Sequence, residues 1–317
     1  MIKETPVIFS KSVKGKVGCT LPSLDVPKLK LSDYLSKSLI RFNKANLPEI
    51  SEPEVMRHFV NLSAKNHHID KDIFPLGSCT MKYNPKINEH IASLNQFSSI
   101  HPNKSDKFCQ SAITIVYELE QMLKKITGMS AFTLQPSAGS QGEFVGLLLM
   151  KKYHELKNNK KNIVLIPESA HGTNPSSVIL AGYKPVELAT DDRGRVDMND
   201  LKSKIDENVA GMMLTQPNTL GLFEDQISKI SNLIHEVDGI MYMDGANLNA
   251  LIGLSKPADM GFDITHINVH KTFSTPHGGG GPGAGPIGVV DKLKDMLPYP
   301  LAKKNKNEYF WDYNIKD

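Results

Sequence analysis

The chain has little cysteine, and its net charge is small. Of its 317 residues only three are cysteine, and the formal charge is +3. The cysteines, Cys19, Cys79 and Cys109, are scattered, which excludes a paired-cysteine metal site and suits a reducing compartment. The small charge gives no reason to expect a nucleic-acid or membrane-surface partner.

Long apolar runs, targeting signals and nucleotide-binding loops are also missing. No apolar stretch approaches the roughly 18 residues of a membrane span. The first residues lack both a signal-peptide core and an Arg-rich presequence pattern. Neither G-x-x-x-x-G-K-[ST] nor a strand-borne G-x-G-x-x-G occurs, and His58, His67 and His68 lack the spacing of metal ligands. We therefore expect a cytoplasmic α/β enzyme that holds no metal and binds no nucleotide through these loops.

The pattern of apolar residues divides the chain into three parts. Residues 1–105 are predicted to form an extended arm that is interrupted by prolines and contains short helices such as 52–66. We expect this arm to wrap around the main body or a partner. Residues 106–295 alternate short apolar runs (162–167, 209–217, 239–244, 262–270) with helical stretches (108–127, 197–208, 226–238). This alternation predicts an α/β domain with a mostly parallel sheet and helices on both faces. Residues 296–317 read as the start of a small C-terminal domain.

Polar residues follow the predicted strands, where open parallel sheets bind ligands. Lys271 comes directly after an apolar run, and partial burial there would lower its pKa and suit it to a Schiff base with a carbonyl compound. The alternative is a surface lysine that caps the strand. Asp244 also ends an apolar run, and a buried carboxylate needs a cation such as a pyridinium nitrogen. The alternative for Asp244 is a turn residue that caps the next helix.

Other stretches offer groups for a phosphorylated planar ligand. The small-residue turn 135–144 precedes a helix, so its backbone N–H groups and the hydroxyls of Ser137 and Ser140 predict a phosphate site, or else an ordinary helix cap. His171 could stack on a ring, with Thr173 and Asn174 as hydrogen-bonding neighbours, or be a plain loop histidine. Asn218 could donate to a phenolic oxygen or belong to a Pro-Asn turn. Ser78, Thr80 and Lys82 could hold a substrate carboxylate.

The order of these groups points to one cofactor. A phosphate turn, a stacking residue, an asparagine turn, a strand-end aspartate with Ala246 two residues later, and a strand-end lysine follow one another. Together they supply the contacts that pyridoxal phosphate requires.

The same stretches resemble a known family. "LGSCTMKYNP", "LQPSAGSQGE", "SAHGTNPSS", "NTLGLFE", "YMDGANLNA" and "NVHKTFSTPHGGGGPGAGPIGV" are similar to the pyridoxal-phosphate-dependent P-protein of the glycine cleavage system, in particular the second subunit of its split form. The resemblance implies fold type I (aspartate-aminotransferase-like), with Lys271 as the Schiff-base lysine. It implies a cofactor site made of Ser137, Ala138, Gly139, Ser140, Gln141, His171, Thr173, Asn218, Asp244, Ala246, Asn247 and His270. Ser140-Gln141 replaces the Ala-His or Ala-Gln that is frequent in the family.

The resemblance also implies a reaction and partners. Glycine would lose CO₂, and its aminomethyl group would pass to the lipoyl arm of the H-protein, which is the glycine dehydrogenase (aminomethyl-transferring) activity. A first P-protein subunit would complete a heterotetramer of two plus two. Two alternatives stay open: another fold-type I enzyme (a decarboxylase or desulfurase), or a non-catalytic scaffolding subunit. Because family members continue beyond position 317, we expect this chain alone to bind cofactor weakly and show little decarboxylation.

Overall fold

A computed structural model describes residues 4–67, 69–72, 74–76, 79–101, 103–274 and 283–314; side chains of 74–76 and 79–81 are not described. The chain divides into two compact units, Met1–Asp72 and Ile73–Asp317. The division at residues 105 and 295 that the sequence suggests stays a prediction. Among the described residues, no helix is both long and apolar enough to cross a membrane.

The described residues of the first unit form one α-helix and bury little apolar surface. Three short 3₁₀ turns (Ile8–Lys11, Leu31–Asp33, Lys37–Leu39) precede α1 (Glu52–Ser63). Ser51 and Glu54 form a reciprocal capping box at the start of α1, which satisfies N–H groups that the helix cannot. Ile50 is the only hydrophobic residue that is buried in the described part of this unit. The described part of this unit therefore has no packed core of its own.

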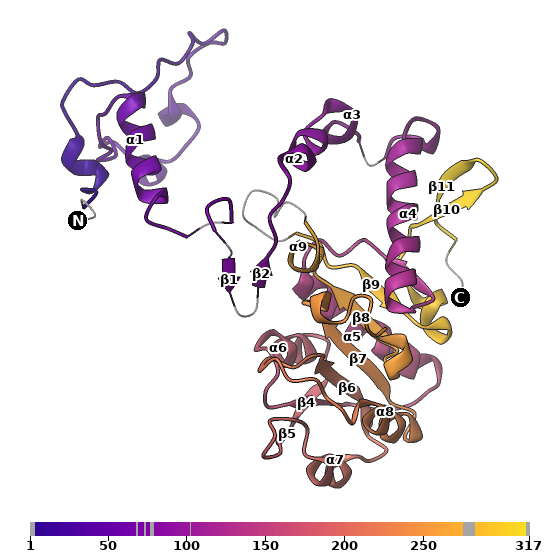
Figure 1. Cartoon of the computed structure of the whole chain (residues 1–317). Coiled ribbons are helices and arrows are strands. Elements are labelled where there is room, and N and C mark those ends of the chain that lie inside the picture. Colours follow the sequence, from indigo (N-terminus) through magenta and orange to yellow (C-terminus); the bar gives the residue numbers. More distant parts are fainter. Residues whose placement is uncertain are drawn as a thin grey trace. The chain divides into compact units, whose positions relative to one another are not determined.

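The second unit is built on a seven-stranded sheet (Figure 1). Its strands are β3 (Ala131–Thr133), β4 (Ile163–Pro167), β5 (Lys184–Leu188), β6 (Val209–Thr215), β7 (Ile240–Gly245), β8 (Ile264–Ile267) and β9 (Ile287–Val289). They lie in the order β3-β9-β8-β7-β6-β4-β5. Strands β4 to β8 are parallel, and β9 runs antiparallel to both of its neighbours. The predicted, mostly parallel α/β sheet is confirmed.

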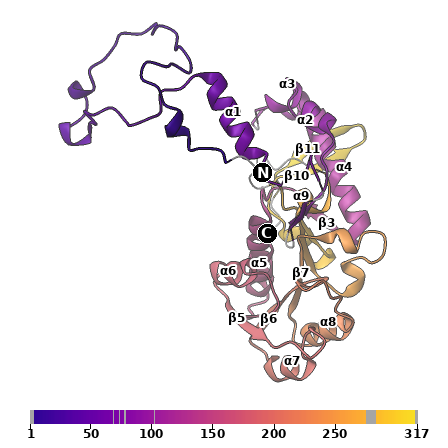
Figure 2. The same ribbon diagram turned by 60° about the vertical axis from the view of Figure 1, so that its left-hand side comes forward.

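Helices cover both faces of this sheet (Figure 2). They are α4 (Gln110–Thr127), α5 (Gly139–Leu156), α6 (Thr173–Leu180), α7 (Met198–Lys204) and α8 (Ile227–Glu236). The side chains of β7 alternate: Met241 and Met243 belong to the core beneath α4, α7 and α8, whereas Ile240 and Tyr242 belong to the core beneath α5 and α6. Because both faces are buried, the strands read in the sequence as continuous apolar runs.

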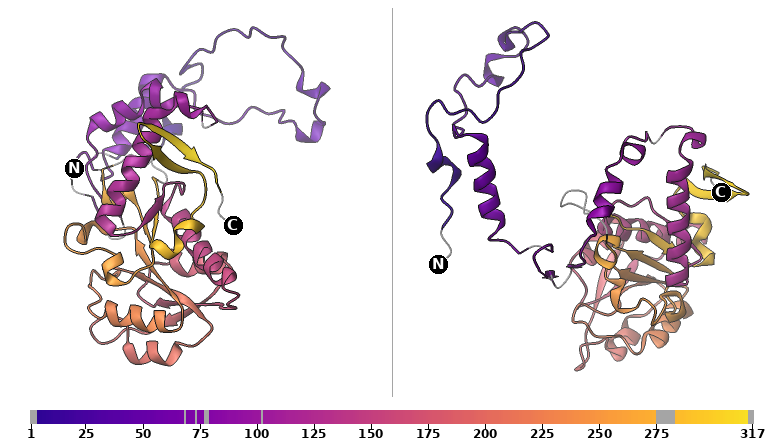
Figure 3. Two further views of the ribbon diagram at one scale, coloured as in Figure 1. Left: turned by 90° about the vertical axis from the view of Figure 1, so that its right-hand side faces the viewer. Right: turned by 45° about the horizontal axis from the view of Figure 1, so that its top comes forward.

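Smaller elements flank the sheet. They are β1 (Phe74–Leu76), β2 (Cys79–Met81), α2 (Lys86–Ala92), α3 (Asn95–Ser98), 3₁₀ turns at Asp106–Phe108, Leu248–Ala250, Ala258–Met260 and Asp291–Met296, and the hairpin β10 (Leu301–Asn305) and β11 (Glu308–Asp312). The hairpin lies beside α4 (Figure 3). The Gln110 side chain donates to the Tyr309 carbonyl (2.6 Å) and accepts from its N–H (2.9 Å).

The segment that carries Lys271 differs from the prediction. The strand predicted over residues 262–270 ends at Ile267, and residues Val269–Thr272 form a single helical turn, α9. The Asn268 carbonyl accepts from the N–H groups of Lys271 (2.9 Å) and Thr272 (3.0 Å), which closes the turn. Lys271 therefore stands on a turn after the strand.

Candidate functional site

A cavity of about 400 Å³ opens where β6, β7 and β8 end and α5 begins. Most of the residues predicted for the site line it: Gly139, Ser140, His171, Thr173, Asn218, Asp244, Ala246, Asn247, His270 and Lys271. Ser137, Ala138 and Gln141 are not among the lining residues; the Gln141 side chain instead accepts from the Ser137 N–H (2.8 Å) and hydroxyl (2.7 Å). The cavity thus brings together groups that lie more than one hundred positions apart in the sequence.

The beginning of α5 packs closely against the segment after β8. A Cβ atom on Gly139 would lie 2.3 Å from Asn268 Oδ1, and one on Gly285 would lie 2.2 Å from the Ala138 carbonyl oxygen. Only glycine permits these approaches, which bring the first turn of α5 to the cavity. The first N–H groups of a helix have no partner inside the helix, and the helix dipole adds positive potential there. This end of α5 is suited to an anion such as a phosphate.

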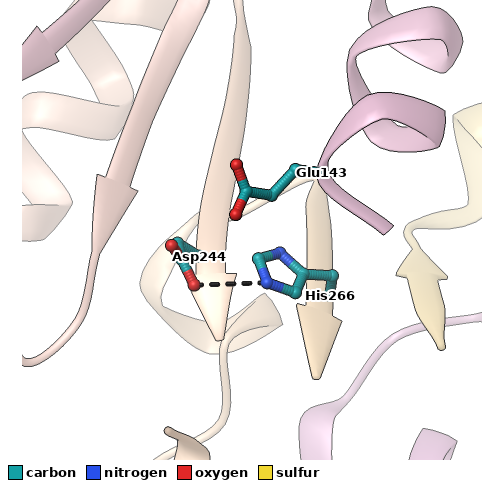
Figure 4. A group of neighbouring side chains, drawn as sticks. All are labelled: Glu143, Asp244 and His266. Carbon is teal, nitrogen blue, oxygen red and sulfur yellow. Dashed lines mark ion pairs between the residues drawn. The ribbon is translucent and has the colours of Figure 1, made fainter. Parts of the chain in front are cut away.

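Asp244 is buried at the end of β7 and is held from several sides. Its Oδ2 accepts from Asn174 Nδ2 (2.9 Å), and its Oδ1 accepts from the Ala246 N–H (2.9 Å). His266 Nε2 lies 3.3 Å from Oδ1 (Figure 4). Burial opposes ionisation, but His266 and these hydrogen bonds outweigh it and hold the pKa of Asp244 below its ordinary value. The site therefore presents a carboxylate that is suited to a cationic ring nitrogen.

Sequence reasoning did not identify Glu143 and His266, which accompany Asp244 (Figure 4). Both are buried, and the ligand atoms of the three residues all lie within 4.8 Å of one another. Glu143 Oε1 accepts from the Thr173 hydroxyl (2.7 Å), and Oε2 accepts from the Ser177 hydroxyl (2.9 Å). In the sequence, Glu143 stands inside the apolar run "GEFVGLLL" and His266 inside "ITHI", and this position could have drawn attention to both. Such residues need buried partners.

His171 is linked to Glu143 through Thr173. The Thr173 hydroxyl donates to Glu143 Oε1 (2.7 Å), and its oxygen lies 2.8 Å from His171 Nδ1, which also accepts from the Thr173 N–H (3.3 Å). The imidazole is exposed, at the mouth of the cavity. This connection restricts the orientation of His171, as a ring that stacks on a planar ligand requires.

Lys271 is half-buried and lines the cavity. The Lys82 ammonium donates to the Lys271 carbonyl at 2.8 Å, which brings one residue of the predicted substrate group to the site. Ser78 lies outside the described residues, as does the side chain of Thr80. Residues 278–281 of the glycine-rich stretch also lie outside them.

Asn218 lines the cavity, but its side chain also organises its own loop. Oδ1 accepts from the N–H groups of Leu220 and Leu222 (3.0 Å each), and Nδ2 donates to the Gly194 carbonyl (2.8 Å). These bonds form the Pro-Asn turn that is the alternative interpretation of Asn218 in the sequence. Because an amide nitrogen carries two protons, one donor is left for a ligand.

The cavity contains buried polar atoms that suit a polar ligand. Among the described residues, Thr215 Oγ1, Asn249 Oδ1 and Asn268 Oδ1 are buried without a hydrogen-bond partner, and all three residues line the cavity. Buried polar atoms are rarely left unpaired. Together with the anion site, the carboxylate and the lysine, they fit a phosphorylated, nitrogen-containing aldehyde such as pyridoxal phosphate.

A second cavity, of about 500 Å³, lies between α4, β3 and the hairpin. It contains none of the residues predicted for the site. Glu120 is the only carboxylate among its lining residues. Most of the residues predicted for the site line the smaller cavity instead.

Comparison with known proteins identifies the family. Residues 28–307 match the family model of the glycine cleavage system P-protein. The chain is 52% identical over 316 residues to a probable glycine dehydrogenase (decarboxylating) subunit 2 of Chloroherpeton thalassium, covering 98% of this chain and 64% of the relative. It is 50% identical over 315 residues to a protein of the same name from Pyrococcus horikoshii, covering 98% and 62%. The chain thus spans slightly less than two thirds of these relatives.

Solved structures confirm the fold class. A glycine decarboxylase (P-protein) of the glycine cleavage system superposes with a TM-score of 0.70 at 20% identity, covering 89% of this chain and 64% of that one. Sphingosine-1-phosphate lyase of Burkholderia pseudomallei gives a TM-score of 0.59 at 16% identity, covering 86% and 65%. These are fold-type I enzymes, so the predicted fold type is confirmed. By its sequence, this chain belongs to the glycine cleavage system P-protein family.

Proposed function

We propose that this chain carries the pyridoxal-phosphate site of a glycine-decarboxylating enzyme. One observation supports the proposal most: the first turn of α5, His171, Asp244 and Lys271 converge on a single cavity. When bound, pyridoxal phosphate supplies an electron sink for the carbanion that remains after CO₂ leaves glycine. The aminomethyl carbon then bonds to one sulfur of the lipoyl disulfide of an H-protein, and the S–S bond breaks to leave the other sulfur as a thiol.

Each group has a distinct task in this proposal. The first turn of α5 holds the phosphate through its N–H groups. Asp244 would hold the ring nitrogen and keep it protonated, because an ionised carboxylate stabilises a neighbouring cation. His171 and Ala246, which both line the cavity, would contact the two faces of the ring. The Lys271 amine would hold the aldehyde of the cofactor, and as a free amine it could hold or move a proton.

Further contacts are proposed for the substrate and for other subunits. Ser78, Thr80 and Lys82 hold the glycine carboxylate, and Lys82 is the member of this group that contacts the Lys271 turn. The relatives are named subunit 2. We therefore propose a first subunit as partner, in a heterotetramer of two plus two, in the cytoplasm.

Release of CO₂ tests this function. The full-length protein, with its partner subunit and a lipoylated carrier, is given carboxyl-labelled glycine. We expect labelled CO₂ from the unmodified protein and from Lys152→Arg, an exposed lysine on α5, but none from Lys271→Arg. Turnover by Lys271→Arg at the unmodified rate would contradict the proposal, as would the absence of glycine-dependent CO₂ from the unmodified assembly.

A further inference from the structure

A line of buried hydrogen-bonding groups leads into Asp244 from the side away from the cavity. His266 is on β8, next to Asp244 on β7, and is fully buried. Its Nδ1 lies 2.8 Å from the Tyr242 hydroxyl, and its Nε2 lies 3.3 Å from Asp244 Oδ1. His266 does not line the cavity, so it acts on a ligand there only through Asp244.

The partners of His266 determine which nitrogen carries the proton. Burial, and secondarily the charges of Glu143 and Asp244, raise the pKa of Tyr242 well above its ordinary value, so its hydroxyl keeps its proton. That proton has two acceptors within reach, His266 Nδ1 at 2.8 Å and the Gly142 carbonyl at 3.4 Å. The shorter contact goes to His266. Nδ1 is then the acceptor, and the proton of the imidazole is on Nε2.

The Nε2–H group has a suitable acceptor in Asp244 Oδ1. Among the described residues, Nε2 makes no hydrogen bond of good geometry, although it is fully buried. Asp244 Oδ1 is an ionised acceptor at 3.3 Å, and a small rotation of the imidazole or the carboxylate would align the N–H with it. A buried donor left unpaired is costly, which favours this closure.

The neighbouring carboxylate does not turn this cluster into a metal site. Each of the four oxygens of Glu143 and Asp244 accepts a hydrogen bond from a neighbouring side chain or N–H group. His266 uses Nδ1 for Tyr242. The Glu143 carboxylate therefore adds negative charge near Asp244, and this charge favours a cation in the cavity.

We propose that His266, with its tautomer fixed by Tyr242, is a positioning residue that orients the Asp244 carboxylate toward a protonated ring nitrogen in the cavity. The proposal rests on the pyridoxal-phosphate site described above. In this arrangement the Tyr242 hydroxyl donates to His266 Nδ1, and the His266 Nε2–H group donates to Asp244 Oδ1.

The first test uses the chain without cofactor. In ¹⁵N NMR of histidine-labelled protein, the His266 signal is assigned by its loss in His266→Gln. We expect the shifts of an Nε2-protonated imidazole whose Nδ1 accepts a hydrogen bond. In Tyr242→Phe, the Nδ1 shift should move to that of a free lone pair. An Nδ1-protonated imidazole in the unmodified chain, or one mole of bound metal per chain, would overturn the proposal.

The second test measures the affinity for pyridoxal phosphate by its visible absorbance. Gln places an amide N–H near the position of Nε2, whereas Leu has no donor. We therefore expect His266→Leu to bind about tenfold more weakly or worse and with a shifted band, and His266→Gln to recover most of the loss. His154→Leu serves as the control, because His154 is also buried but binds the Ala210 carbonyl away from the cavity.

The outcomes separate the two proposals. Failure of the unmodified chain to bind pyridoxal phosphate would contradict the proposed function, while the tautomer measured in the cofactor-free chain still decides the role of His266. Normal binding by His266→Leu would overturn the positioning role and leave the function intact. If His266→Leu does not fold, the tautomer in the unmodified chain and its response to Tyr242→Phe decide the matter.

Discussion

Replacing Gly146 by alanine probes the packing that holds Tyr242 behind the site. Gly146 is a buried residue of α5, and a Cβ atom there would lie 2.1 Å from Tyr242 Cε2. Alanine in a helix interior gains about 1 kcal/mol over glycine. Forcing a methyl group against a buried ring costs about 2 kcal/mol. Loss of the Tyr242–His266 hydrogen bond costs about 1 kcal/mol more. The net expectation is a chain less stable by about 2 kcal/mol.

Urea unfolding measures this difference. The chain has a single tryptophan, Trp311 on β11, so its fluorescence reports on the second unit, and circular dichroism follows the helices. Gly172→Ala is the control, because a Cβ atom there meets nothing within 4 Å. In a Tyr242→Leu background the cost of Gly146→Ala should shrink. A Gly146→Ala chain as stable as the unmodified one would refute the packing argument.

Three further predictions concern the cavity and two buried carboxyl groups. Gly139→Ala should displace the Asn268 amide, cost about 1–3 kcal/mol in urea unfolding, and weaken pyridoxal phosphate binding; unchanged affinity would contradict the close approach. Burial raises the pKa of Glu120, so ionisation destabilises the folded chain as pH rises; Glu120→Gln should gain melting temperature relative to the unmodified chain between about pH 4 and pH 7. Burial opposes ionisation of Asp263 too, but His235 and Lys292 outweigh it and lower its pKa. That stabilisation is present at neutral pH and is lost in acid, so Asp263→Asn should cost about 3 kcal/mol near pH 7 and less near pH 3. A pH trend of opposite sign in either variant would contradict the assignment.

The strands could be predicted from the sequence because the sheet is buried on both faces, so its strands are continuous apolar runs. The runs 162–167, 209–217 and 239–244 became β4, β6 and β7, and the helix predicted over 108–127 became α4. Gly128, with φ of 75°, ends that helix in the left-handed conformation. The turn α9 was not predicted because four residues are too few to show helical periodicity, and the apolar pattern continues through it.

Most of the residues predicted for the site line one cavity, since parallel strands end at one edge of a sheet, and their role there stays a prediction. Asp244 and Lys271 were predicted because each is a polar residue at the end of an apolar run. Glu143 and His266 were missed because a polar residue inside a helix or strand gives no sign of its partners. Their hydrogen bonds join segments up to 34 positions apart, which only the folded chain brings together.

Covalent trapping tests the central claim, that Lys271 holds pyridoxal phosphate in this cavity. The chain is incubated with an excess of pyridoxal phosphate, reduced with borohydride, digested and mapped by mass spectrometry. We predict one dominant pyridoxyl adduct, on the peptide that contains Lys271, and its loss in Lys271→Arg. An adduct on Lys82 in its place, or labelling spread equally over exposed lysines, would contradict the claim.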